Sequence, residues 1–177
     1  MPPKNKKKSK QKAKEDPGNE KHPSSDPTYL FAIYTQFCKK IGLEPNDNVK
    51  KSLLDSENNP NYGKQILIDG NDCYFGPGAC RALATALLGR VGDKENPESM
   101  NQEEPIIYCA LQELCIWSGS LHDEGTMAIA ELLRLGGAEL QLNHLELINC
   151  DVQINGATAI GRSLSCGVGI QKNVDSL

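Results

Sequence analysis

Few residues in this chain could carry out chemistry: 177 residues contain seven cysteines and three histidines. No two cysteines have the C-x2-C spacing that often holds zinc, and the histidines do not cluster with the cysteines in the sequence. The G-P-G run at Gly76–Gly78 lacks the following G-K-S/T of a phosphate-binding loop. We therefore expect no metal site and no cofactor.

Cys115 and His144 are the pair that comes nearest to a nucleophile and its base, because they fall at neighbouring strand positions in the pattern described below. A working pair needs a third group to orient the histidine and donors to stabilise an oxyanion, and the sequence offers neither. We therefore expect ordinary outward-facing strand residues, no enzyme and no small-molecule substrate. An odd number of cysteines without a secretory signal indicates a reducing, cytoplasmic compartment.

The elements that position these residues come from an internal repeat with a constant offset in the sequence, which leads from Leu111 to Leu142 and from Leu133 to Leu164. The first copy contains Leu111, Leu114, Ile116, Gly119, Leu121, Gly125, Ile129 and Leu133, which match Leu142, Leu145, Leu147, Cys150, Val152, Gly156, Ile160 and Leu164. Alternation at Leu145 and Leu147 predicts a strand, and the spacing of four at Gly156, Ile160 and Leu164 predicts a helix. Each copy is therefore a short strand, a turn and a helix.

This pattern resembles the leucine-rich repeat of the ribonuclease-inhibitor type, L-x-x-L-x-L-x-x-N/C-x-L followed by a glycine and a full helix. The resemblance implies an α/β solenoid with short parallel strands on the concave side and helices on the convex side. The step from Leu111 to Leu142 is longer than the usual repeat of about 20–29 residues, and we place the extra residues near Leu135–Leu140. Gly119 replaces the turn Asn or Cys, so we expect that turn to be looser or bonded through Ser118 or Ser120.

The chain divides into a disordered Lys-rich tail (1–25), a helical cap (26–57) and about three repeats with an acidic insertion at 91–106 and an incomplete fourth repeat (58–177). Asp26-Pro27 predicts the start of the first cap helix, and Asn46 or Asp47 predicts the start of the second. The earliest repeat begins with a strand at Ile66 and Ile68. No run approaches the ~18 apolar residues of a membrane span, so we expect none.

The tail is basic, whereas the rest of the chain is acidic. Residues 1–21 contain eight lysines and three acids, a net charge of +5 (8 − 3), and the whole chain is −4, which leaves −9 for residues 22–177. The tail is either a solvated segment that aids solubility, a nuclear-localisation signal, or a tether to a polyanion such as an acidic protein tail, RNA or anionic lipid. Nucleic acid is expected only at the tail. The candidate polyanion-binding residues are Lys4, Lys6, Lys7, Lys8, Lys10, Lys12 and Lys14.

Alternate residues of the strands are expected to face outward and to bind a protein partner. These residues are Leu67, Asp69, Glu113, Cys115, Trp117, His144, Glu146 and Ile148. Trp117 is the single tryptophan and is not at a core position, so it either packs on neighbouring elements or anchors a partner. The three acidic residues favour a basic or mixed partner.

These features predict a non-catalytic protein-interaction or scaffold module. The run from Tyr34 to Asn46, Y-T-Q-F-C-K-K-I-G-L-E-P-N, resembles the lead-in of leucine-rich-repeat proteins of centrosomes and cilia. That likeness implies a cytoskeletal or ciliary setting, with tubulin or other axonemal proteins as partners. The alternative is an inhibitor or regulator of a globular enzyme or GTPase. It ranks lower because a GTPase regulator needs an arginine on a loop, and all four arginines lie in or beside predicted helices: Arg81, Arg90, Arg134 and Arg162.

Overall fold

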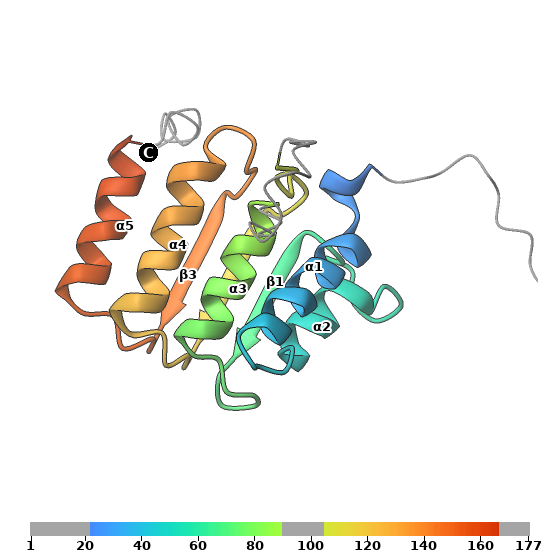
Figure 1. Ribbon diagram of the computed structural model, residues 1–177, viewed down its shortest axis with the longest axis horizontal. Coiled ribbons are helices and arrows are strands. Elements are labelled where there is room, and N and C mark those ends of the chain that lie inside the picture. The colour runs from blue at the N-terminus through green and yellow to red at the C-terminus, as the bar shows by residue number, and fades with distance from the viewer. Residues whose placement is uncertain (1–21, 90–104, 167–177) are drawn as a thin grey trace, which may run out of the picture.

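The computed structural model describes residues 22–89 and 105–166. In chain order they form a 3-10 turn η1 (Pro23–Ser25), α1 (Pro27–Lys40), α2 (Asp47–Leu54), β1 (Gln65–Asp69), α3 (Pro77–Leu87), β2 (Glu113–Trp117), α4 (His122–Gly136), β3 (His144–Ile148) and α5 (Ile154–Cys166). The strands form one parallel sheet in the order β1-β2-β3, and Figure 1 shows α3, α4 and α5 side by side in a layer over one face of it. None of the helices in these two ranges has the length and apolar character needed to span a bilayer.

The predicted leucine-rich-repeat solenoid is wrong. The described chain is a small α/β unit with five α-helices and one open sheet of three parallel strands. The concave and convex surfaces of a solenoid build up from a small rotation at each of many repeats, and three strands are too few for that. A sequence period specifies how one strand-turn-helix unit meets the next, but not how many units stack. Residues 1–21 of the Lys-rich tail, most of the insertion and the incomplete fourth repeat lie outside the described residues, whereas Pro23–Ser25 of the segment predicted to be disordered form η1.

The register of the sheet reproduces the period of the sequence. Glu113 pairs with His144 and Trp117 with Ile148, and both pairs have the same offset in the sequence as Leu111 and Leu142. Parallel neighbours need a crossover connection, and α3 and α4 lie in the two crossovers here. Equivalent positions of the repeat therefore lie side by side in space.

The face of the sheet under the helices forms the core. Ile66, Ile68, Leu114 and Ile116 are almost completely buried, as the alternation along β1 and β2 requires. The fully buried helix residues of this cluster include Leu83, Leu87, Ile129 and Leu132. Burying one such side chain contributes roughly 1.5–3 kcal/mol. The corresponding residues of β3 are only partly buried, so the last unit is less completely covered within the described chain.

Small and polar residues join each helix to the one before it. A Cβ atom at Gly125 of α4 would lie 3.3 Å from the Cα atom of Pro77 on α3, and one at Gly156 of α5 would lie 2.9 Å from the Cβ atom of Thr126 on α4. The carboxylate of Asp123, in the first turn of α4, accepts hydrogen bonds from the backbone N–H groups of Gln153 (3.0 Å) and Gly156 (2.8 Å). These two N–H groups lie at the start of α5, so a side chain of one unit caps the helix of the next.

The two N-terminal helices begin where the sequence predicts. Asp26 Oδ1 accepts a hydrogen bond from the N–H group of Thr28 (3.0 Å), which caps α1. Asn46 Oδ1 accepts hydrogen bonds from the N–H groups of Asn48 (2.9 Å) and Val49 (3.3 Å), which caps α2. Gly42, at φ +72°, follows the end of α1 and reverses the chain.

Helix α2 lies along the outer edge of β1. Ser52 Oγ accepts a hydrogen bond from the backbone N–H of Leu67 (3.2 Å), and Asn48 Nδ2 donates to the carbonyl of Asp69 (3.1 Å). Both polar side chains are buried. They supply partners to an edge strand that would otherwise present unpaired backbone groups.

Candidate functional site

All eight residues of the predicted partner-binding surface lie on the face of the sheet opposite the helices. The register places them in three rows: Gln65, Glu113 and His144; Leu67, Cys115 and Glu146; Asp69, Trp117 and Ile148. We call these nine residues the open sheet face. Sequence reasoning missed Gln65, although its alternation with Leu67 and Asp69 would have predicted it.

The open sheet face is exposed at its two edges and buried at its centre. Leu67 on β1 is 37% exposed and Ile148 on β3 is 43% exposed, whereas Cys115 on β2 is only 4% exposed. Trp117 is half-buried between Asp69 and Ile148. Cys115 was expected to point outward; it does lie on this face, but its neighbours on both sides cover it.

Polar contacts hold two corners of the open sheet face. Gln65 Nε2 donates to Glu113 Oε2 at 2.6 Å, which ties β1 to β2. At the other end, Asn71 Nδ2 donates to Ser118 Oγ at 3.1 Å. Ser118 is one of the two residues expected to bond the turn beside Gly119, and its hydroxyl accepts from a side chain of the turn after β1. These bonds fix the side chains that flank the face.

Electrostatics at the centre of the face disfavour a thiolate. Burial raises the pKa of the Cys115 thiol to about 11, and the negative charge of Glu146, its hydrogen bond with that carboxylate and the charge of Glu113 act in the same direction. An activated cysteine nucleophile needs a lowered pKa. The structure therefore brings Cys115 and His144 together, but in surroundings opposite to those of a catalytic Cys–His pair.

His144 and Glu146 lie on the same side of β3. His144 Nε2 is 3.7 Å from Glu146 Oε2, and both side chains are partly exposed. The Sγ atom of Cys115, one ring nitrogen of His144 and one carboxylate oxygen of Glu146 all lie within 4.8 Å of one another. Sequence reasoning placed Cys115 and His144 at neighbouring strand positions but did not predict that Glu146 joins them in one group.

No protein-family model matches this chain, and no curated protein is significantly similar to it. The resemblance to leucine-rich repeats therefore rests on the sequence motifs alone. The function has to be inferred from the chemistry of the described surfaces.

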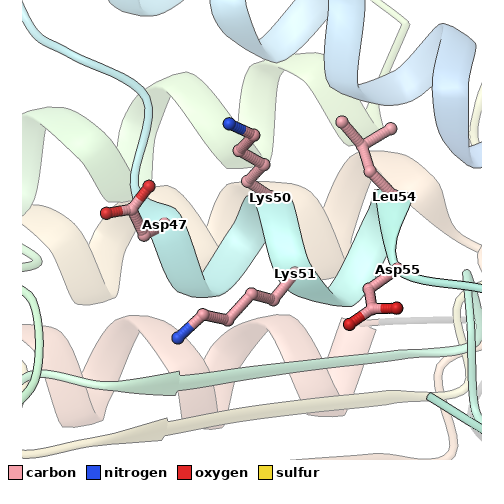
Figure 2. Close-up of a pocket in the computed structure, with 5 residues that line it drawn as sticks. All are labelled: Asp47, Lys50, Lys51, Leu54 and Asp55. Carbon is pink, nitrogen blue, oxygen red and sulfur yellow. The ribbon is translucent and has the colours of Figure 1, made fainter. Parts of the chain in front are cut away.

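A second surface feature is a pocket on α2 lined by Asp47, Lys50, Lys51, Leu54 and Asp55. Figure 2 shows that all five side chains come from one helix and its C-terminal neighbour, with Lys50 and Leu54 on one side of α2 and Lys51 and Asp55 on the other. Two lysines balance two acids in this lining. The pocket is therefore a surface of α2 with mixed charge.

The remaining sequence predictions concern charged side chains. The lysines from Lys4 to Lys14 lie outside the described residues, so their binding to a polyanion stays a prediction. Arg81, Arg134 and Arg162 lie on α3, α4 and α5, as predicted, and all three are exposed. None of these three described arginines is the loop arginine that GTPase regulation would need, and Arg90 lies outside the described residues.

Proposed function

We propose that this chain is a non-catalytic protein-interaction module that binds a protein segment on the open sheet face. The observation that carries the proposal is the row of Asp69, Trp117 and Ile148 beside the row of Leu67, Cys115 and Glu146. Two parallel rows place aromatic and aliphatic side chains among carboxylates on a surface that the helices leave open. Tryptophan surrounded by such residues is typical of the centre of a protein interface.

The charge of the open sheet face indicates which kind of partner it would bind. Asp69, Glu113 and Glu146 give the open sheet face a negative potential, and Leu67 and Ile148 supply exposed apolar area at its two edges. Complementary charges increase the rate of association and exclude acidic competitors. The partner in this proposal is therefore a segment that combines lysine or arginine with aliphatic or aromatic side chains.

The sequence motifs add a setting to this proposal. In it, the Lys-rich tail contacts an acidic surface while the open sheet face holds a basic segment, so the chain links two partners of opposite charge. A cytoskeletal or ciliary assembly, where tubulin supplies acidic tails, would suit both contacts. This setting is supported by the tail composition and by the run from Tyr34 to Asn46.

A display library of random peptides selected on the full chain tests the proposed binding. We expect enrichment of peptides that contain basic and apolar residues, and binding of these peptides should change the fluorescence of Trp117, the single tryptophan. The Ile148→Asp and Leu67→Asp variants should each weaken binding at least tenfold, because they place a charge at an apolar contact.

Met127→Asp is the matched control. The side chain of Met127 is 49% exposed, a fraction similar to that of Ile148, but Met127 lies on α4 in the helix layer. The Met127→Asp variant should bind the selected peptides with the affinity of the wild type. Equal binding to Ile148→Asp and Leu67→Asp, or a loss confined to Met127→Asp, would assign the interaction to another surface and overturn the proposal.

A further inference from the structure

Three side chains that can ligate a metal converge at the centre of the open sheet face. Cys115 lies on β2, Glu146 is its register partner on β3, and His144 lies two residues before Glu146 on the same side of that strand. One ligand atom of each lies within 4.8 Å of the others. The sheet register therefore supplies a sulfur, a nitrogen and an oxygen ligand from backbone positions that the pairing of β2 with β3 holds side by side.

We propose that Cys115, His144 and Glu146 bind a divalent transition-metal ion, with Zn²⁺ preferred. Thiolate, imidazole and carboxylate are the three ligand types that zinc takes in proteins. Tetrahedral bonds of about 2.0–2.3 Å place ligand atoms roughly 3.3–3.8 Å apart. The separation of 3.7 Å between His144 Nε2 and Glu146 Oε2 already meets that spacing. The Sγ atom of Cys115 lies within 4.8 Å of both other ligand atoms.

The surroundings of the three ligands suit a cation. Glu113 is the register partner of His144, and its own carboxylate is a further negative group beside the ligands. Gln65 donates a hydrogen bond to this carboxylate and holds it in place. Leu67 lies on the other side of Cys115 and provides an apolar wall. A cation at this point would be attracted by the two carboxylates and would displace the proton of the Cys115 thiol, so that the sulfur binds as a thiolate.

Access and coordination number follow from the exposure of the ligands. His144 and Glu146 are partly exposed and can rotate to admit an ion, whereas buried Cys115 forms the base of the site. Three protein ligands leave a fourth tetrahedral position, which water would occupy on the solvent side. The proposed site needs no partner protein, so it stands independently of the proposed function.

Titration of the reduced, metal-free full-length chain with Co²⁺ tests the proposal, because a cobalt–thiolate bond absorbs in the near ultraviolet and tetrahedral cobalt absorbs in the visible. We expect both bands to saturate at one equivalent and to disappear when Zn²⁺ is added. Cys115→Ser should abolish the thiolate band, and His144→Gln and Glu146→Gln should each weaken Co²⁺ binding at least tenfold.

Two matched variants control for the other cysteines and histidines of the chain. Cys73→Ser and His122→Gln alter residues outside the cluster and should bind Co²⁺ with wild-type affinity and spectra. A thiolate band that persists in Cys115→Ser, or the absence of a band at one equivalent in the wild type, overturns the proposal. If Cys115→Ser does not fold, the His144→Gln variant tests the proposal, because His144 is exposed and its substitution leaves the core unchanged. Unchanged Co²⁺ binding in His144→Gln would also overturn the proposal.

Discussion

Gly70, directly after β1, illustrates how closely the turns of neighbouring units fit. Its N–H group donates to the carbonyl of Trp117 at 2.7 Å, and a Cβ atom at this position would overlap the Ser118 carbonyl oxygen and lie 2.6 Å from the carbonyl carbon. These atoms belong to the backbone, so they cannot rotate out of the way. Gly70→Ala should therefore lower the free energy of unfolding by roughly 1–3 kcal/mol, as measured by urea denaturation.

Gly161 provides the matched glycine. It lies inside α5, and a Cβ atom there would meet nothing within 4 Å. Gly161→Ala should raise the free energy of unfolding by about 0.5–1 kcal/mol, because alanine has the higher helix propensity. The same loss of stability in both variants would show that the turn contact at Gly70 has no special role.

Cys80 makes the free energy of unfolding depend on pH in the alkaline range. Burial raises the pKa of its thiol to about 12, above the ordinary value of 9.0. The unfolded chain then loses this proton first as the pH rises, so the stability that the neutral thiol contributes is complete below pH 9.0 and is lost between pH 9.0 and about 12. The free energy of unfolding should fall over this range, with Cys80 contributing up to about 1.4 kcal/mol per pH unit.

Cys80→Ala separates this contribution from those of other titrating groups. The thiol of Cys80 donates to the carbonyl of Gly125 at 3.3 Å, so the variant should be less stable at every pH but should have a shallower slope above pH 9.0. Denaturant midpoints measured at several pH values give both slopes. Parallel slopes for the two proteins would contradict the assignment.

At the scale of elements, the Ser52 hydroxyl is one of the two side-chain groups through which α2 protects the edge of the sheet. Removing Ser52 Oγ in Ser52→Ala leaves the N–H of Leu67 without its hydrogen-bond acceptor. The cost should be about 1–3 kcal/mol, and amide hydrogen exchange at Leu67 should accelerate while that at Ile116 on the central strand changes less. Lys50→Ala, an exposed change on the same helix, should leave exchange at Leu67 unaffected.

Elements are also the scale at which the sequence was most informative. Alternation at Ile66 and Ile68 and the spacing of Ile160 and Leu164 predicted strands and helices that the structure contains, because both periods report which side of an element meets the core. The constant offset of the repeat also predicted which positions of β2 and β3 lie side by side. The pattern also placed Cys115 near His144, but the burial of Cys115 and the convergence of its side chain with those of His144 and Glu146 were not predicted, because a period in the sequence does not specify side-chain conformation or exposure.

At the scale of the whole molecule, the prediction of a solenoid failed because local pattern does not determine how far a stack extends. The charge distribution is also a property of the whole chain, and it leads to a separate prediction. A tail of +5 (8 − 3) on a chain of −4 should bind poly-glutamate, and this binding should weaken severalfold as the ionic strength rises from roughly 0.02 to 0.15 M. Fluorescence anisotropy with labelled poly-glutamate measures it.

Deletion of residues 1–21 should abolish binding to poly-glutamate, since it removes eight lysines. Ile148→Asp changes the open sheet face alone and should bind poly-glutamate as the wild type does. If the deletion left the affinity and its salt dependence unchanged, the tail would not be the anion-binding segment.

The carboxylate of Asp123 gives the folding of this chain a direction. Because it accepts hydrogen bonds from two N–H groups at the start of α5, the first turn of α5 has its cap only after α4 has formed. Synthesis also delivers α4 before α5, so the order in which the ribosome releases the chain matches the order in which one helix prepares the next. We therefore expect nascent α5 to dock on a helix that is already in place.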